Sequence, residues 1–105
     1  MWTVETLNDV VNAELEELPA DMLARFHYIS ELIREFGLER VREPHVRHLR
    51  ASLWEMLKGK DGISRALYVT AFDRRVVVVR VFVKKTEQTP IREIELALRR
   101  AKEIQ

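Results

Sequence analysis

The sequence contains no cysteine among its 105 residues, which excludes disulfide bonds and metal sites built on thiolates. No apolar run approaches the roughly 20 residues that a membrane-spanning helix needs, and the first residues lack the basic start and apolar core of a signal peptide. Only three glycines are present, and there is no Gly/Ser-rich linker, internal repeat or low-complexity tract. We therefore expect one intact cytoplasmic domain over residues 1–105, with no membrane partner.

The net charge of +1 conceals two halves of opposite sign. Residues 1–39 hold two Lys/Arg and nine Asp/Glu, whereas residues 40–105 hold 16 Lys/Arg and eight Asp/Glu. This separation is compatible with a basic surface for a polyanion and an acidic surface for another partner. It is equally compatible with solvated helix faces in the first half and solubilising charge in the second. The 47% hydrophobic and 33% charged content is that of a globular domain.

The chain begins with a predicted strand and a short helix. Residues 1–7 alternate apolar and polar side chains, as a half-buried strand does. Asn8 can cap a helix that runs to about Leu18, with its glutamates mostly off the apolar face. Pro19 ends this helix.

A second helix is predicted from Ala20 to Phe36, because its apolar residues recur every three or four positions. Gly37 follows as a C-terminal stop signal. We interpret the aromatic and aliphatic stripe of this helix as core rather than as a cofactor site. The charged segment Glu39–Arg50 is interrupted by Pro44 and is predicted to be irregular.

Beyond residue 52 the periodicity changes from that of helices to that of strands separated by turns. Lys58–Gly62 contains the Asp-Gly pair of a tight hairpin turn, and Asp73 marks another turn. The valine run 76–79 leaves no polar face, as in a central strand covered on both sides. Thr89 can cap a final helix with Pro90 at its first position. The predicted segments are strands Leu53–Leu57, Ile63–Phe72 and Arg75–Lys85 and a helix with an apolar side at Ile91, Ile94, Leu98 and Ala101.

The order strand, two helices, three strands, helix predicts an α+β fold with helices on a small, mostly antiparallel sheet. Alternation along the last strand predicts two sets of residues on opposite faces. Two cations that flank an aromatic ring would make a platform for phosphate and base, although cations at strand ends also serve to protect sheet edges. The first face holds Val78, Arg80, Phe82 and Lys84, and the second holds Val79, Val81, Val83 and Lys85.

Several segments carry a family resemblance, and the block Phe82–Thr86 followed by Thr89 and Pro90 is the most specific of them. The others are Leu53–Met56, Lys58–Ile63, Arg65–Tyr68, Glu93–Glu95 and Pro44–Leu49. Together they resemble the phage-derived branch of the RelE/HigB toxins of type II toxin–antitoxin systems over essentially the whole chain. The resemblance implies a RelE-type α+β fold and endoribonuclease cleavage of mRNA, usually on the translating ribosome. It also implies a small antitoxin partner, commonly a helix-turn-helix protein.

The resemblance assigns Arg65 and Lys84 to transition-state stabilisation, with Lys85 and Arg80 close to them. Attack of a ribose 2′-hydroxyl on the adjacent phosphate develops negative charge, which a cluster of Arg and Lys stabilises. Such a site needs no metal or other cofactor.

Lys58 and Lys60 would hold the RNA backbone from the hairpin turn. Tyr68 would stack on a base or orient the scissile phosphate, or it would be a buried tyrosine of the sheet. His48 is a candidate for RNA binding and for general acid or base catalysis. A metal pair of His45 and His48 is disfavoured, because Pro44 opposes a helix there and no carboxylate stands at ligand spacing.

The chain departs from the family pattern after Met56. The pattern has an arginine after this block, whereas Leu57 and Lys58 follow here, as though one residue were missing. A deletion in a strand moves the following residues to the opposite face unless a bulge or turn absorbs it. The chain is then either a detoxified form or a natural variant with weaker activity.

Two further hypotheses remain open on the sequence alone. The first is a non-catalytic module of the same fold that binds RNA or an acidic protein, and the second is a purely structural interaction domain. The acidic first half gives an antitoxin a possible docking surface around Glu14, Glu16 and Glu17. The pair Glu93 and Glu95 is interpreted as a solvated, salt-bridging face rather than as catalytic carboxylates.

Overall fold

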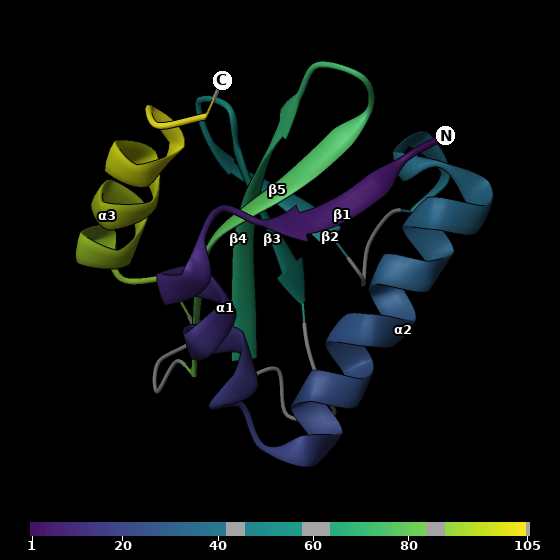
Figure 1. Cartoon of the computed structure of the whole chain (residues 1–105). Helices are drawn as coiled ribbons and strands as arrows, with labels where there is room; N and C mark the ends of the chain where they lie inside the picture. Colours follow the sequence, from purple (N-terminus) through teal and green to yellow (C-terminus); the bar gives the residue numbers. More distant parts are fainter. Residues whose placement is uncertain (42–45, 58–63, 84–87, 105) are drawn as a thin grey trace.

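Five strands form one sheet, and three α-helices pack against its two faces (Figure 1). The computed structural model describes residues 1–41, 46–57, 64–83 and 88–104. The elements are β1 (Thr3–Thr6), α1 (Asp9–Glu16), α2 (Ala20–Phe36), the 3₁₀ turn η1 (Leu38–Arg40), β2 (Val46–Arg50), β3 (Leu53–Leu57), β4 (Ser64–Ala71), β5 (Arg75–Val83) and α3 (Ile91–Ala101). The strand order is β1-β5-β4-β3-β2, and only the β1–β5 pair is parallel. The predicted α+β class is confirmed.

The hydrophobic core has two layers that share the interior strand β5. One layer packs α1 and α2 against the sheet and includes Ile33, Val76 and Val78. The other layer packs α3 against the opposite face and includes Val77 and Val79. All four valines are at most 1% exposed, which confirms the prediction of a strand covered on both sides.

The two N-terminal helices form where their sequence signals predict. The side chain of Asn8 accepts a hydrogen bond from the Val11 amide at 3.0 Å and caps α1. α2 has the predicted bounds, and Gly37 ends it with φ +88°, a backbone conformation that disfavours residues with a Cβ. None of the described helices is long and apolar enough to cross a membrane.

The prediction of an irregular segment at Glu39–Arg50 is wrong, because its second part forms the edge strand β2. Val46 is buried, whereas Arg47 and His48 are exposed, and all three pair with residues of β3. An edge strand tolerates this density of charge, which hides the alternation of a strand from a reading of the sequence. The turn after β2 also lacks Gly, Asn or Asp, since Ala51 supplies the positive φ of 51°.

The predicted faces of β5 are wrong on the N-terminal side of Arg80. Leu67 pairs with Arg80 but Tyr68 pairs with Val78, so β5 contains one extra residue, Val79, at a β-bulge. The bulge changes which residues share a face: Val78 and Val81 lie in the layer of α1 and α2, and Val79 and Phe82 in that of α3. Simple alternation predicts instead that Val78 lies on the same face as Phe82, and Val79 on the same face as Val81.

Charged side chains from two helices form hydrogen bonds with backbone groups of β5 beyond the end of β1. The parallel pairing with β1 ends at Val78, and the Leu7 amide donates to the Val78 carbonyl at 2.9 Å. Further along, the Val81 amide donates to Glu14 of α1 at 3.2 Å, and Arg100 of α3 donates to the Val79 carbonyl at 2.9 Å. Arg100 also pairs with Glu14 at 2.9 Å. The backbone groups of β5 that β1 leaves unpaired are therefore bonded by an ion pair that connects both helices.

We expect Glu14→Ala to lower the free energy of unfolding by about 2–4 kcal/mol, because it leaves Arg80, Arg100 and the Val81 amide without this carboxylate. Denaturant unfolding in urea measures the difference. Glu16→Ala, an exposed position of the same helix, is the matched control and should change stability by no more than about 0.5 kcal/mol. Equal effects of the two substitutions would contradict the role given to Glu14.

Acid should weaken the wild-type protein more steeply than Glu14→Gln. Burial raises the pKa of Glu14, but hydrogen bonds from Arg100 and the Val81 amide and the charges of Arg80 and Arg100 outweigh it, so the pKa lies below the ordinary 4.5. A carboxyl group with a lowered folded-state pKa stabilises the fold above its unfolded pKa, and this stability is lost as the pH falls through the folded value. Unfolding curves from about pH 6 to about pH 3 measure the two slopes. Parallel curves would refute the assignment.

Candidate functional site

Two predicted site residues, Arg65 and Arg80, lie with Phe82 on the face of the sheet that α3 covers. The β4–β5 pairing sets Arg65 opposite Phe82 and sets Arg80 opposite Leu67, so both arginines project from adjacent strands on one side. The guanidinium carbon of Arg80 lies 5.6 Å from the centre of the Phe82 ring. Of the predicted platform of Arg80, Phe82 and Lys84, the structure describes Arg80 and Phe82 on this face, and Arg65 lies beside them on the neighbouring strand.

Arg80 is held by two carboxylates from different helices. Its Nε and Nη2 donate to Glu93 of α3 at 2.7 and 3.2 Å, and its Nη1 lies 2.8 Å from Glu14 of α1. The hydrogen bonds to Glu93 are the main cause that raises the pKa of Arg80 above its ordinary value. Arg80 therefore connects α1, β5 and α3, and its guanidinium is occupied by contacts within the protein.

Arg65 is buried, with 6% of its side chain exposed, and it faces a carboxylate that is fully buried. Its Nε lies 2.8 Å from Glu55 Oε1 of β3, and its Nη1 donates to the Ser64 carbonyl at 3.0 Å. Burial lowers the pKa of Arg65, and the charge and hydrogen bond of Glu55 oppose this shift. Because Glu55 is the counter-ion of a predicted catalytic residue, it belongs to the site.

Glu55 has two further partners, Arg47 and Thr89. None of these three residues is among the site residues that the sequence predicts. Arg47 of β2 approaches Oε1 with its Nη2 at 3.3 Å, and Thr89 donates its hydroxyl to Oε2 at 3.0 Å. The predicted Thr89 cap is wrong: Pro90 is the cap residue of α3, with no side-chain hydrogen bond, because the Thr89 hydroxyl is directed to Glu55. A signal was present in β3, since alternation places Glu55 on the same face as the buried Leu53, where a charge requires partners.

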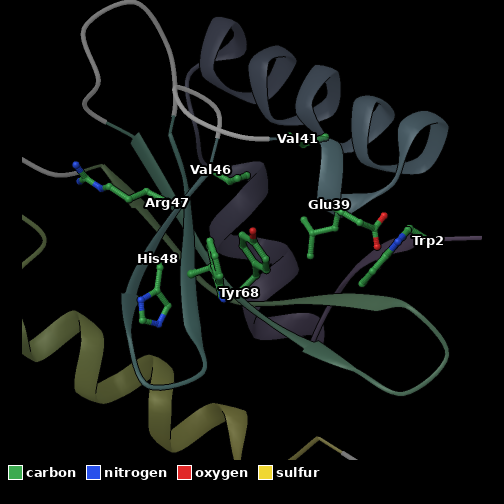
Figure 2. A pocket seen from close by; sticks show the side chains of 9 residues that line it. Trp2, Glu39, Val41, Val46, Arg47, His48 and Tyr68 are labelled. Carbon is green, nitrogen blue, oxygen red and sulfur yellow. The ribbon is translucent and has the colours of Figure 1, made fainter.

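Tyr68 and His48 lie on the opposite face of the sheet, away from Arg65 and Arg80. Both line a surface pocket of about 680 Å³ between the sheet and the η1 turn that follows α2 (Figure 2). Tyr68 is 1% exposed, and burial raises its pKa, so at neutral pH it is a hydrogen-bond donor and not a base. The pocket is mainly apolar and is lined by Trp2, Leu38, Glu39, Val41, Val46, Arg47, His48, Trp54 and Tyr68.

His48 is fixed within its own hairpin. One ring nitrogen lies 2.7 Å from the Ala51 carbonyl oxygen, and the ring meets Trp54 edge to face at a centroid distance of 5.1 Å. In the part of the chain that the structure describes, no three His, Cys, Asp or Glu side chains gather as metal ligands. The remaining predicted site residues lie outside the described residues: Lys58, Lys60, Lys84, Lys85 and His45.

The sequence matches the family described as "Phage derived protein Gp49-like (DUF891)" over residues 13–102. No curated protein matches it significantly. Solved structures that share the fold include the following two. A chain of the archaeal RelE–RelB complex from Pyrococcus horikoshii OT3 has a TM-score of 0.57 and 18% identity, covering 79% of this chain and 94% of that chain. The isolated E. coli RelE toxin has a TM-score of 0.54 and 13% identity, covering 96% and 99%.

These similarities confirm, at the level of family and fold, the resemblance that the sequence segments carry. The family match covers most of the chain, and both structural matches extend over nearly the full length of the RelE-type chains. The chain belongs to the phage-derived Gp49-like family and has the fold of the RelE-type toxins.

Proposed function

We propose that this chain is the toxin of a type II toxin–antitoxin pair of the RelE/HigB kind and cleaves mRNA as an endoribonuclease. The observation that supports this most strongly is the RelE-type fold of a phage-derived family member, which extends over almost the whole chain. The arginines that β2, β4 and β5 contribute to one face of the sheet add a chemical reason. Arg65 and Arg80 are paired with carboxylates of the protein, so a polyanionic substrate would contact the exposed part of Arg47 and the proposed lysines.

The proposed reaction is attack of a ribose 2′-oxygen on the adjacent phosphorus, in which the bond from phosphorus to the leaving 5′-oxygen breaks. The 2′-hydroxyl gives up its proton, and the leaving oxygen gains one. Negative charge accumulates on the phosphate oxygens, and cations in the site stabilise it without a metal. Lys84 and Lys85 are the proposed stabilising cations with Arg65 and Arg80, and Lys58 and Lys60 would bind the RNA backbone.

The face of the sheet on which Tyr68 and His48 lie restricts what these residues can do. Both are on the face opposite Arg65 and Arg80, so a role beside the scissile phosphate would require RNA to pass around the sheet edge. The proposed contribution of His48 is a base contact at the apolar pocket, whereas Tyr68, which is 1% exposed, fits the alternative of a buried tyrosine of the sheet.

The proposed setting is the cytoplasm, with the translating ribosome and its mRNA as the target. A cognate helix-turn-helix antitoxin would hold the chain inactive. The archaeal structure is described as a RelE–RelB complex, which supports an antitoxin partner for a chain of this fold. Glu14 is already bonded to Arg80 and Arg100, so an acidic docking surface on α1 would depend on Glu16 and Glu17, which are exposed.

A non-catalytic binding module is the second candidate, and two observations favour it. Arg65 and Arg80 are both already paired with carboxylates of the protein. In addition, the arginine that the family pattern has after Met56 is missing. Such a module would bind single-stranded RNA with a strong dependence on salt and would leave it uncut.

We expect expression of the chain alone to arrest bacterial growth and to truncate cellular mRNA. The double variant Lys84→Ala and Lys85→Ala should relieve the arrest, because it removes two cations that stabilise the transition state. Growth curves and mapping of new mRNA 5′ ends measure both effects.

The matched control removes two cations of α3 and its end, Arg99→Ala and Lys102→Ala, which are both exposed. This control should remain as toxic as the wild type. Salt-dependent RNA binding without new mRNA ends would support the binding module, and harmless expression without RNA binding would refute both functions.

A further inference from the structure

The carboxylate of Glu55 lies at the centre of a chain of three charged residues across three strands. It is fully buried and lies within 3.3 Å of both Arg47 of β2 and Arg65 of β4, while the Thr89 hydroxyl donates to it as well. Arg47 and Glu55 are directly opposite in the β2–β3 pairing. The order Arg65, Glu55, Arg47 therefore leads from the interior of the sheet to its edge.

The two arginines differ strongly in their access to a ligand. Only 6% of the Arg65 side chain is exposed, and its guanidinium also donates to the Ser64 carbonyl. By contrast, 44% of the Arg47 side chain is exposed, and Figure 2 shows it directed away from Tyr68 and the apolar pocket. A guanidinium group has five N–H donors, and Arg47 directs Nη2 to Glu55. Its exposed part is available to an anion, whereas Arg65 would have to leave its buried partner.

We propose that Arg47 is the arginine that contacts the RNA phosphate, and that Arg65 acts through Glu55 as a positioning residue. This inference rests on the proposed function and assigns the roles within its site. The buried Arg65 holds the Glu55 carboxylate in one place, and Glu55 in turn holds the guanidinium of Arg47 at the surface. A guanidinium fixed in this way binds a phosphate with little loss of side-chain freedom, and its planar donors match two phosphate oxygens.

Thr89 adds a second support to the same carboxylate. Its hydroxyl bonds to Oε2, while Arg65 and Arg47 approach Oε1. Both oxygens are thus fixed, and the carboxylate cannot rotate to release Arg47. The alternative role of Arg47 is that of an edge charge that prevents association of β2 with other strands. That role requires neither Glu55 nor Arg65.

The test compares Arg47→Gln with Arg34→Gln. Arg34 lies on α2, is 40% exposed and also pairs with a glutamate, so the control removes the same charge from a similar setting. Binding of a single-stranded RNA that carries 2′-O-methyl groups, and so cannot be cleaved, is measured between 50 and 200 mM salt, a range over which phosphate contacts weaken strongly. We expect Arg47→Gln to weaken binding about tenfold at the lower salt and to reduce the salt slope by about 0.7. Arg34→Gln should change neither quantity.

Glu55→Gln tests the positioning role. It retains the shape of the side chain but removes the charge that fixes Arg47, so we expect the kcat of RNA cleavage to fall about tenfold or more. Its KM should stay the same or fall, because the neutral amide removes a negative charge that lies behind Arg47 and opposes the charge of the RNA. A purely structural role would lower the apparent kcat only by lowering the folded fraction, so kcat is expressed per folded molecule, and for a purely structural role that value would equal the wild-type value. Circular dichroism checks folding. Where Glu55→Gln does not fold, Arg65→Lys, which retains the buried charge but not the planar guanidinium, tests the positioning role by the same fall in kcat.

The outcomes distinguish a failure of the proposed function from a failure of the roles given to Arg47 and Glu55. A wild-type chain that neither binds nor cleaves RNA refutes the proposed function, and this inference with it. A wild-type chain that binds or cleaves RNA, but with Arg47→Gln equal to Arg34→Gln, refutes only the role of Arg47. Loss of binding in Arg47→Gln together with an unchanged kcat in Glu55→Gln refutes the positioning role.

Discussion

The fold depends on the hydrogen bonds that one carboxylate, Glu14, and its ion-pair partner Arg100 make along the interior strand β5. β5 is longer than its parallel neighbour β1, so the backbone groups at Val79 and Val81 need other partners. Glu14 and Arg100 supply these hydrogen bonds, and their mutual ion pair holds the two side chains together. Buried backbone groups without partners would cost free energy comparable to lost hydrogen bonds. The contact also joins helices on opposite faces of the sheet, and it therefore fixes both layers of the core relative to β5.

This contact gives a structural meaning to the separation of charge along the sequence. Glu14 and Glu5 come from the acidic half, and they pair with Arg80, Arg100 and Arg75 of the basic half. Part of the charge asymmetry is thus neutralised inside the folded chain. The cations that remain exposed, and not the total of 16 in the basic half, determine which surface attracts a polyanion. On the described face of the sheet, burial removes Arg65 from this group and leaves Arg47 in it.

The sequence predicts the parts of the fold that local chemistry determines. The bounds of α2 follow from its apolar spacing and from Gly37, and the Asn8 cap and the buried valines of β5 are equally local. β2 and the bulge at Val79 depend on pairing between distant segments, which periodicity within one segment does not contain. The bulge matters for the site, because it decides that Arg80 and Phe82 share the α3 face with Val79 rather than with Val78.

The candidate site was less predictable than the fold, because resemblance points to cations while the structure depends on their counter-ions. Arg65 and Arg80 were selected for their positive charge, yet Glu55, Glu14 and Glu93 determine what each arginine can contact. Glu55 was visible in principle as a charge in an apolar strand. Its partners were not, because Arg47 and Thr89 are eight and 34 residues away along the chain.

The β3–β4 pairing shows how β3 is built where the family pattern has an arginine after Met56. Trp54, Glu55, Met56 and Leu57 pair in unbroken register with Tyr68, Leu67, Ala66 and Arg65, so the paired part of β3 contains no bulge that would absorb a deletion. The charged residue that the described part of β3 contributes to this face is Glu55, an anion. The cations around it come from the neighbouring strands, Arg65 from β4 and Arg47 from β2. The exposed guanidinium beside Glu55 therefore comes from β2, a strand whose charged residues and neighbouring Pro44 predict an irregular segment.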